Sequence, residues 1–333
     1  MLNKDLNLNE KMFDADVEQV PIRKGFGEGF LIAGDNNEQV VGICADLTES
    51  TMMHLFRDKF PNRFVQVGVA EQNLATVASG MAAMGKIPFI SSYAMFSPGR
   101  NWEQIRTTIC YNDRPVKIAG SHAGISVGPD GGTHQAIEDI AITRVIPNMC
   151  VISPVDAVQA KLATIACAIT PTPTYLRLVR EKTAIMTTEK TPFEIGKSYI
   201  YWQPMNNNIA TVGIIATGAL VHKALLAAAE LEKENIYVVV LALPTIKPLD
   251  TDGVLEFIKN NGNKLNGIVT VEEHQIAGGM GSAIAEFLVQ NNPLPMRFVG
   301  VKDKFGQSGK PEELIEHYGM GTKDIIKAVK ELL

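Results

Sequence analysis

The segment "RFVQVGVAEQNLATVASGMAAMG", residues 63–85, places one carboxylate, Glu71, where an apolar strand-like run gives way to a helix-like run. Residues 74–83 of the helix-like run carry no charge and many small side chains. A helix that is apolar or small on every side is buried, and small residues let another backbone approach closely. We therefore expect Glu71 at a buried junction, where a carboxylate needs a hydrogen-bond partner. The helix dipole alone would stabilise an acid here by about 0.3–1 kcal/mol, so a structural role stays open beside a functional one.

A second group of reactive side chains lies in the loop "SHAGISVGPDGGTHQ", residues 121–135. The loop follows a strand-like run, contains His122, Asp130 and His134, and precedes a helix that we expect to begin near Thr133. Loops after the carboxyl ends of parallel strands are where α/β folds place their sites. The pattern favours hydrogen bonds to a polar substrate over a metal site, because the three residues lack ligand spacing. Plain turn formation remains an alternative.

A third segment, "SSYAMFSPGRNW" at residues 91–102, contains Tyr93, Phe96 and Trp102. These aromatic side chains suit either a protein core or a pocket for a flat ring, and the segment alone does not decide between them.

The bulk composition is that of an ordinary globular protein, with 333 residues, 46% of them apolar, and a net charge of -5. With no long basic run, we expect neither nucleic acid nor an anionic membrane as a partner. No apolar run approaches the roughly 18 residues of a membrane span, and the first 20 residues lack the apolar core of a signal peptide. The four cysteines share no C-x-x-C spacing and are predicted to be buried free thiols, which favours a reducing compartment, the cytoplasm.

Short apolar runs alternate with helix-like stretches, which predicts an α/β protein with mostly parallel sheets. The predicted strands are "VVGICADL", "RFVQVG", "IPFISSY", "PVKIAGSH", "MCVISP", "TYLRLVR", "IATVGIIATG", "IYVVVLAL", "GIVTVEE" and "MRFVGV". A polar stretch with prolines and an asparagine triplet interrupts the series, so we expect two domains, 1–190 and 209–333, joined by a linker at 191–208.

Taken together, these stretches resemble the transketolase family, specifically its pyrimidine-binding and C-terminal domains. The matching segments are "ADLTES" (45–50), "VGVAEQNLATVASGMAAMG" (67–85), "SSYAMF" (91–96), "SHAGISVGPDGGTHQAIEDI" (121–140), "LVREK" (178–182) and "DKFGQSGKPEELIEHYGM" (303–320). The resemblance implies two three-layer αβα domains, the first with a mainly parallel sheet and the second with a mixed sheet. It also implies thiamine diphosphate as the cofactor.

The resemblance assigns the cofactor's pyrimidine ring to this chain. Glu71 matches the glutamate that hydrogen-bonds a ring nitrogen and so promotes loss of the proton from the thiazolium carbon. Tyr93 and Phe96 match aromatics that hold the ring, and Asp46 lies in the segment near the cofactor. Where many members have a third aromatic, this chain has Gly99, and Trp102 is the expected substitute.

The resemblance also assigns the sugar substrate. His122, Asp130 and His134 match residues that hydrogen-bond the donor ketose near its reacting carbons, so Glu71, His122 and His134 are the predicted catalytic residues. The residues expected to hold the sugar phosphate are Arg23, Ser50, His122 and Arg180. Arginine suits this task because its planar fork can pair two phosphate oxygens.

The family's diphosphate-binding domain, with its Gly-Asp-Gly and a downstream Asn, has no counterpart in this sequence. We therefore expect no metal site in this chain, and Mg²⁺ or Ca²⁺ held mainly by a separate N-terminal subunit in an α2β2 assembly. This chain then resembles the C-terminal subunit of a split transketolase, inactive alone. Assembled, it would transfer a two-carbon ketol unit from a ketose phosphate such as xylulose 5-phosphate to an aldose phosphate.

Three alternatives remain. A 1-deoxyxylulose-5-phosphate synthase shares the glutamate and the loop but generally lacks a histidine where His122 stands. The β-subunit of a 2-oxoacid dehydrogenase also needs a partner, but its corresponding loop differs from "VGPDGGTHQ". A non-catalytic paralogue is the third, although Glu71 and both loop histidines are retained.

Overall fold

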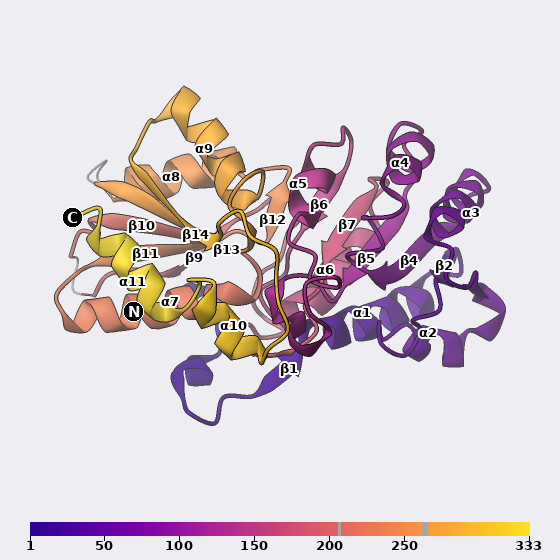
Figure 1. The fold of residues 1–333 in the computed structure, drawn as a ribbon, viewed down its shortest axis with the longest axis horizontal. Coiled ribbons are helices and arrows are strands. Elements are labelled where there is room, and N and C mark those ends of the chain that lie inside the picture. Colours follow the sequence, from indigo (N-terminus) through magenta and orange to yellow (C-terminus); the bar gives the residue numbers. More distant parts are fainter. Residues whose placement is uncertain (206–207, 262–264) are drawn as a thin grey trace.

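The computed structural model describes residues 1–205, 208–261 and 265–333 and has two lobes side by side (Figure 1). The first 190 residues contain η1 (Lys4–Leu6), η2 (Glu10–Phe13), β1 (Gln19–Pro21), α1 (Ile22–Asn36), β2 (Val40–Cys44), α2 (His54–Lys59), η3 (Pro61–Arg63), β3 (Phe64–Gln66), α3 (Glu71–Ala83), β4 (Ile87–Tyr93), α4 (Trp102–Gln104), η4 (Ile105–Cys110), β5 (Lys117–Ser121), η5 (Ile125–Asp130), α5 (Asp139–Arg144), β6 (Cys150–Ile152), α6 (Ala157–Ala168), β7 (Thr174–Arg177) and β8 (Lys182–Ala184). The later residues contain β9 (Tyr199–Trp202), β10 (Val212–Ala216), η6 (Gly218–Leu220), α7 (Val221–Lys233), β11 (Val238–Ala242), β12 (Thr245–Lys247), α8 (Thr251–Asn260), β13 (Gly267–Gln275), α9 (Met280–Asn291), β14 (Met296–Val301), α10 (Pro311–His317) and α11 (Thr322–Lys330).

The first lobe is a three-layer αβα arrangement. Its sheet has the order β12-β6-β7-β5-β4-β2-β3, and all neighbouring strands are parallel except the edge pair β12 and β6. Successive residues of β2 point to opposite faces, Ile43 into the core under α3 and Cys44 into the core under α1. A Cβ at Gly25 or Gly29 would run into the backbone of α6, so these glycines let α1 lie close against that helix. Strands covered on both faces explain the continuous apolar runs in the sequence.

The second lobe repeats the three layers around a smaller, mixed sheet. The strand order is β14-β13-β10-β11-β9, and only β9 runs antiparallel to its neighbour in the residues that the structure describes. Helices α7 and α11 supply apolar residues to the core on one face, while α8 and α9 supply the core on the other. The predicted α/β fold, mainly parallel in the first lobe and mixed in the second, is therefore confirmed.

The chain crosses between the lobes more often than a simple two-domain sequence suggests. The stretch predicted as a linker, 191–208, contributes β9 to the second sheet. Strand β12 lies in the later half of the chain but pairs with β6 in the first sheet, Thr245 opposite Ile152. At the other end of the chain, the Asn3 amide donates to the Tyr201 carbonyl of β9 at 3.0 Å.

One predicted helix start is displaced. The helix expected near Thr133 begins at Asp139, because residues 131–138 form turns around the predicted substrate loop. Helix α6 begins at Ala157, and its N-cap is Asp156, whose carboxylate accepts the Gln159 amide. The four cysteines are buried and free. Nowhere in the described part of the chain does a helix have the length and apolarity to cross a membrane.

Candidate active site

Glu71 is the first residue of α3, at the edge of the sheet where β3 ends. Gly68, with a φ of 71°, turns the chain between β3 and the helix. The Glu71 side chain is only 2% exposed, as expected for a junction beneath small residues. The helix start presents backbone N–H groups without intrahelical partners, which favours a negative charge at this position.

The partner of the Glu71 carboxylate is Arg100. Its Nη1 lies 2.8 Å from Glu71 Oε2. Within the described residues, Oε1 of Glu71 accepts no hydrogen bond from the protein. Arg100 is half exposed, so it approaches the buried carboxylate from the solvent side. Sequence analysis named Gly99 and Trp102 in this segment but assigned no role to Arg100, which follows Gly99.

Asn101 holds the backbone of Glu71 rather than its carboxylate. Its Nδ2 donates to the Glu71 carbonyl at 2.9 Å and to Ser97 Oγ at 3.2 Å. Its Oδ1 is buried without a partner among the described residues. A buried acceptor without a donor is costly unless a donor is supplied from outside the chain. Asn101 was also not predicted, although it lies in the segment at residues 91–102 that contains Tyr93, Phe96 and Trp102.

Tyr93 and Phe96 form an aromatic cluster with the two loop histidines. The Tyr93 and His122 rings are stacked with centroids 3.8 Å apart, and Phe96 meets His134 edge-on at 5.5 Å. The Tyr93 and Phe96 rings are nearly parallel, at 19° and 6.2 Å. Strand β4 ends at Tyr93 and strand β5 ends before His122, so the carboxyl ends of neighbouring parallel strands bring these rings together.

Trp102 lies apart from this cluster. Its indole Nε1 donates to the Ile142 carbonyl of α5 at 2.6 Å, and its ring packs against the apolar core. None of the aromatic ring pairs found in the described residues joins Trp102 to Tyr93 or Phe96. We expected Trp102 to replace the third aromatic at the cofactor's pyrimidine ring. In this structure Phe96 is approached by Arg100, whose Cζ lies 5.2 Å from the Phe96 ring centroid.

Asp46 follows β2 and is held by a residue that sequence analysis missed. Its backbone has a φ of 60°, and its amide donates to Gln66 Oε1 at 2.7 Å. Gln66 also accepts from the Gly68 amide and donates to Thr48 Oγ1, at 3.3 and 2.9 Å. Gln66 therefore ties the Asp46 turn to the turn that precedes Glu71. Gln66 could have been identified in the sequence as a polar residue at the end of an otherwise apolar strand, β3.

The residues predicted to hold the sugar phosphate lie together. Arg23 donates through Nη1 to the Ser50 carbonyl and through Nε to the Arg180 carbonyl, the latter at 3.3 Å. Arg180 Nη1 donates to the Val127 carbonyl at 2.9 Å and lies 3.9 Å from Asp130 Oδ1. Two arginines in one site suit a dianion, although Arg180 Nη1 also lies 3.4 Å from Glu181 Oε1. Burial first, and then the charge of Arg180, lowers the pKa of Arg23.

His122 sits between the aromatic cluster and this basic site. It has a left-handed backbone, with a φ of 57°, and its Nδ1 lies 2.9 Å from the Ser121 hydroxyl. Burial, followed by the nearby charges of Arg23 and Arg180, lowers the pKa of His122 to about 3. The imidazole is therefore neutral at physiological pH, able to donate from one nitrogen and accept at the other. His134 Nδ1 lies 2.9 Å from the Thr133 hydroxyl.

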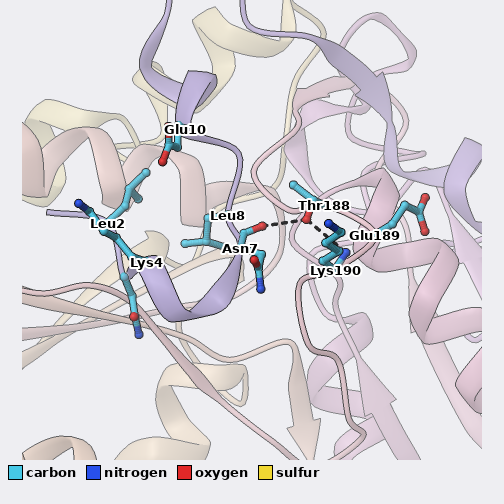
Figure 2. Close-up of a pocket in the computed structure, with 9 residues that line it drawn as sticks. Leu2, Lys4, Asn7, Leu8, Glu10, Thr188, Glu189 and Lys190 are labelled. Carbon is cyan, nitrogen blue, oxygen red and sulfur yellow. Dashed lines mark hydrogen bonds between the residues drawn. The ribbon is translucent and has the colours of Figure 1, made fainter.

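No group of three or more His, Cys, Asp or Glu side chains in the described residues is arranged to hold a metal ion. A cavity of about 590 Å³ lies elsewhere, between the N-terminal segment and residues 188–190 (Figure 2). It includes the hydrogen bond from the Thr188 hydroxyl to the Asn7 carbonyl, 2.8 Å long. No predicted site residue lines it, so side-chain chemistry rather than cavity size identifies the site.

The pyrimidine end of thiamine diphosphate fits the residues present. The Glu71 carboxylate, with one oxygen free of protein donors in the described residues, suits a ring N–H, and Asn101, whose Oδ1 is buried without a partner there, binds the Glu71 carbonyl. Tyr93 and Phe96 offer nearly parallel faces for a planar ring.

Comparisons with known proteins identify the family of both lobes. The transketolase pyrimidine-binding domain matches residues 18–185, and the transketolase C-terminal domain matches residues 207–325. A putative transketolase C-terminal section of Methanocaldococcus jannaschii is 42% identical, over 93% of this chain and 95% of that protein. A 6-deoxy-6-sulfo-D-fructose transketolase subunit of a Clostridium species is 37% identical, over 96% of this chain and 97% of that protein. Human transketolase is 30% identical over 95% of this chain, which spans 49% of the human protein.

A solved structure of a split-gene transketolase, described as an inactive β4 tetramer, superimposes with a TM-score of 0.85 at 39% identity, covering 94% of this chain and 98% of that chain. Transketolase from Campylobacter jejuni shares the fold, with a TM-score of 0.78 at 21% identity over 97% of this chain and 50% of that chain. This chain therefore belongs to the transketolase family, and its two lobes are the pyrimidine-binding and C-terminal domains of that family.

Proposed function

We propose that this chain is the catalytic C-terminal subunit of a split transketolase that moves a two-carbon ketol unit from a ketose phosphate to an aldose phosphate. The observation that carries the proposal is the placement of the Glu71 carboxylate at the start of α3, with the rings of Tyr93 and Phe96 nearby on β4 and the turn after it. Thiamine diphosphate, when bound, supplies the carbon that accepts the ketol unit and the electron sink for carbon–carbon cleavage.

In this proposal Glu71 holds and shares a proton with the pyrimidine nitrogen through Oε1, while Arg100 fixes Oε2. The neutral imidazole of His122 and the imidazole of His134 orient the ketose and move protons at its reacting hydroxyl and carbonyl oxygens. Asp130 accepts a hydrogen bond from a substrate hydroxyl. Arg180, with Arg23 and Ser50, binds the terminal phosphate.

The partner in this proposal is a separate N-terminal subunit that holds the diphosphate and its Mg²⁺ or Ca²⁺, in an α2β2 assembly in the cytoplasm. Two relatives that this chain matches over almost their whole length are named a transketolase C-terminal section and a transketolase subunit. A third, the β4 tetramer, is described as inactive. Those descriptions support a chain that is inactive without its partner. The buried free cysteines suit a reducing compartment.

Co-expression with the gene encoded beside this one, followed by a two-carbon transfer assay, tests the proposal. The sugar panel should include xylulose 5-phosphate with ribose 5-phosphate or glyceraldehyde 3-phosphate, and 6-deoxy-6-sulfofructose because one relative is named for it. We expect turnover by the assembled subunits with thiamine diphosphate and Mg²⁺, and none by this chain alone. Turnover by the single chain would overturn the split assignment, and no transfer by any assembled pair would overturn the activity.

A further inference from the structure

The carboxyl end of β13 carries two adjacent glutamates that are both buried, Glu272 and Glu273. Buried carboxylates need hydrogen bonds, and these two find them on opposite sides of the strand. Glu272 accepts the amides of Met280 at 2.6 Å and Gly281 at 2.8 Å, at the start of α9 in its own lobe. These two hydrogen bonds of Glu272 therefore lie within the second lobe.

Glu273 points the other way, into the first lobe. Its Oε1 accepts the Ser126 amide at 2.6 Å. Ser126 lies in η5, between His122 and Asp130, so the contact is made to the backbone of the substrate loop. A Cβ at Gly124 would collide with the same carboxylate, and the φ of Gly124 is 87°. The loop backbone thus lies directly against Glu273 at two neighbouring points.

The same strand is tied to the end of the loop by Arg177. Arg177 Nη2 donates to the Glu273 carbonyl at 2.7 Å and to the Ala136 carbonyl at 3.3 Å. Gln135 Nε2 donates to the Ile125 carbonyl at 2.9 Å and to the Gln307 carbonyl at 3.0 Å, the latter in the second lobe. The second lobe therefore holds the loop both near its middle and near its end.

We infer that Glu273 is a positioning residue for the sugar site, holding the loop of His122, Asp130 and His134 in shape from the other lobe. The inference rests on the proposed function for the role of that loop. A loop with four glycines has a large conformational entropy to lose, so a fixed acceptor inside it determines its shape. Without the carboxylate, the buried Ser126 amide has no acceptor, and the loop must move to find one.

Amide hydrogen exchange of the isolated chain tests the contact without any activity. In Glu273→Ala we expect peptides from residues 121–135 to exchange roughly fivefold to tenfold faster, while α3 and α9 stay unchanged. Glu273→Gln keeps an oxygen for the Ser126 amide and should restore slow exchange. Glu272→Gln is the matched control, a neighbouring buried glutamate, and should leave the loop unchanged. Unchanged exchange of the loop in Glu273→Ala overturns the inference.

Kinetics of the assembled subunits test the consequence for the site. Glu273→Ala should raise the KM for the ketose phosphate about tenfold with a smaller fall in kcat, and Glu273→Gln should recover most of it. A fall in kcat at unchanged KM would indicate lost folded enzyme and would overturn a positioning role. If Glu273→Ala does not fold, Glu273→Asp, which is one methylene too short for the amide, replaces it in both experiments. If the wild-type assembly transfers no ketol unit, the proposed function fails, whereas the exchange experiment still decides the loop contact.

Discussion

Arg100 Nη1 lies 2.8 Å from Glu71 Oε2, which joins a half-exposed guanidinium to a carboxylate that is almost completely buried. Arg100 donates a hydrogen bond to Oε2 of the Glu71 carboxylate, whereas Oε1 has no protein partner in the described residues. A group that binds at this site therefore meets a carboxylate whose orientation is already fixed. Preorganised acceptors of this kind avoid the cost of reorientation at the moment of reaction.

Replacing Arg100 with alanine should lower the free energy of unfolding by about 1 kcal/mol, because a partly exposed ion pair is screened by solvent. Arg100→Lys should recover part of that loss. Urea unfolding of the isolated chain at two salt concentrations measures the effect. A loss that does not shrink at high salt would show that the arginine acts through packing on Phe96 instead.

Replacing Glu71 with alanine should reduce transfer by the assembled subunits at least about 100-fold, the lower end of the effect of a positioned proton-transfer group. The reason is that Glu71 is the only acidic residue in the first turn of α3, a helix that lies wholly within the described residues. Glu103→Ala removes an exposed acid nearby and should leave the rate unchanged. Steady-state rates with saturating cofactor measure both. Wild-type activity in Glu71→Ala would remove Glu71 from the mechanism.

Replacing Arg180 with alanine should raise the KM for phosphorylated sugars about tenfold to 100-fold, since a charge-assisted contact to phosphate is lost. The KM for an unphosphorylated sugar should barely change. Arg57→Ala, an exposed arginine paired with Glu49, is the control. Equal effects on both kinds of sugar would contradict the phosphate assignment.

The Arg177–Asp139 pair is buried on both sides, and Asp139 Oδ2 also accepts the Tyr175 hydroxyl at 2.7 Å. Asp139→Asn should therefore destabilise the chain by about 3–5 kcal/mol, because it leaves a buried guanidinium without its counter-charge. The exposed Lys59–Asp35 pair offers a contrast, and Asp35→Asn should cost less than about 1 kcal/mol. Chemical unfolding of the two variants makes the comparison, and similar losses would refute it.

Because the pKa of His122 is low in the folded state, the free energy of unfolding should decrease as the pH falls. The unfolded state takes up a proton near pH 6.5 while the folded state stays neutral down to about pH 3, so protonation of the unfolded state costs stability as the pH falls. Relative to His122→Asn, the wild-type chain should lose on the order of 2 kcal/mol between pH 7.5 and 5.0. Asparagine is chosen because it tolerates the left-handed backbone. A difference that is constant across this pH range would contradict burial of a neutral imidazole.

Most of the fold was predictable from the sequence because buried parallel strands leave continuous apolar runs. Each of the ten apolar runs named above contains a strand. The strands that were not predicted, β1, β8, β9 and β12, have only three or four residues each. Such short strands carry no periodicity of their own, and partners distant in the sequence determine them. For the same reason the sequence predicts a linker at 191–208, although β9 lies within that stretch.

The site residues also differ in how far the sequence alone could identify them. Glu71 and the loop histidines could be singled out because an unexpected charge or a glycine-rich loop marks them. No such feature of the sequence singles out Arg100, Gln66 or Glu273, because each forms its hydrogen bond with a residue remote in the sequence. The partners are Glu71, Asp46 and Ser126, at separations of 29, 20 and 147 residues respectively. The displacement of Trp102 from the ring cluster has the same origin, because its hydrogen bond goes to α5 rather than to a neighbour in sequence.

The pairing of strand β12 with β6 determines where this protein can be divided into fragments. A fragment that stops before residue 209 would keep β6 but lose its antiparallel neighbour, and would expose a bare strand edge to other molecules. A fragment of the later residues alone would carry β12 with nothing to pair with. The two halves are not interchangeable modules, so a chimaera that swaps one of them must carry β12 together with the sheet it completes.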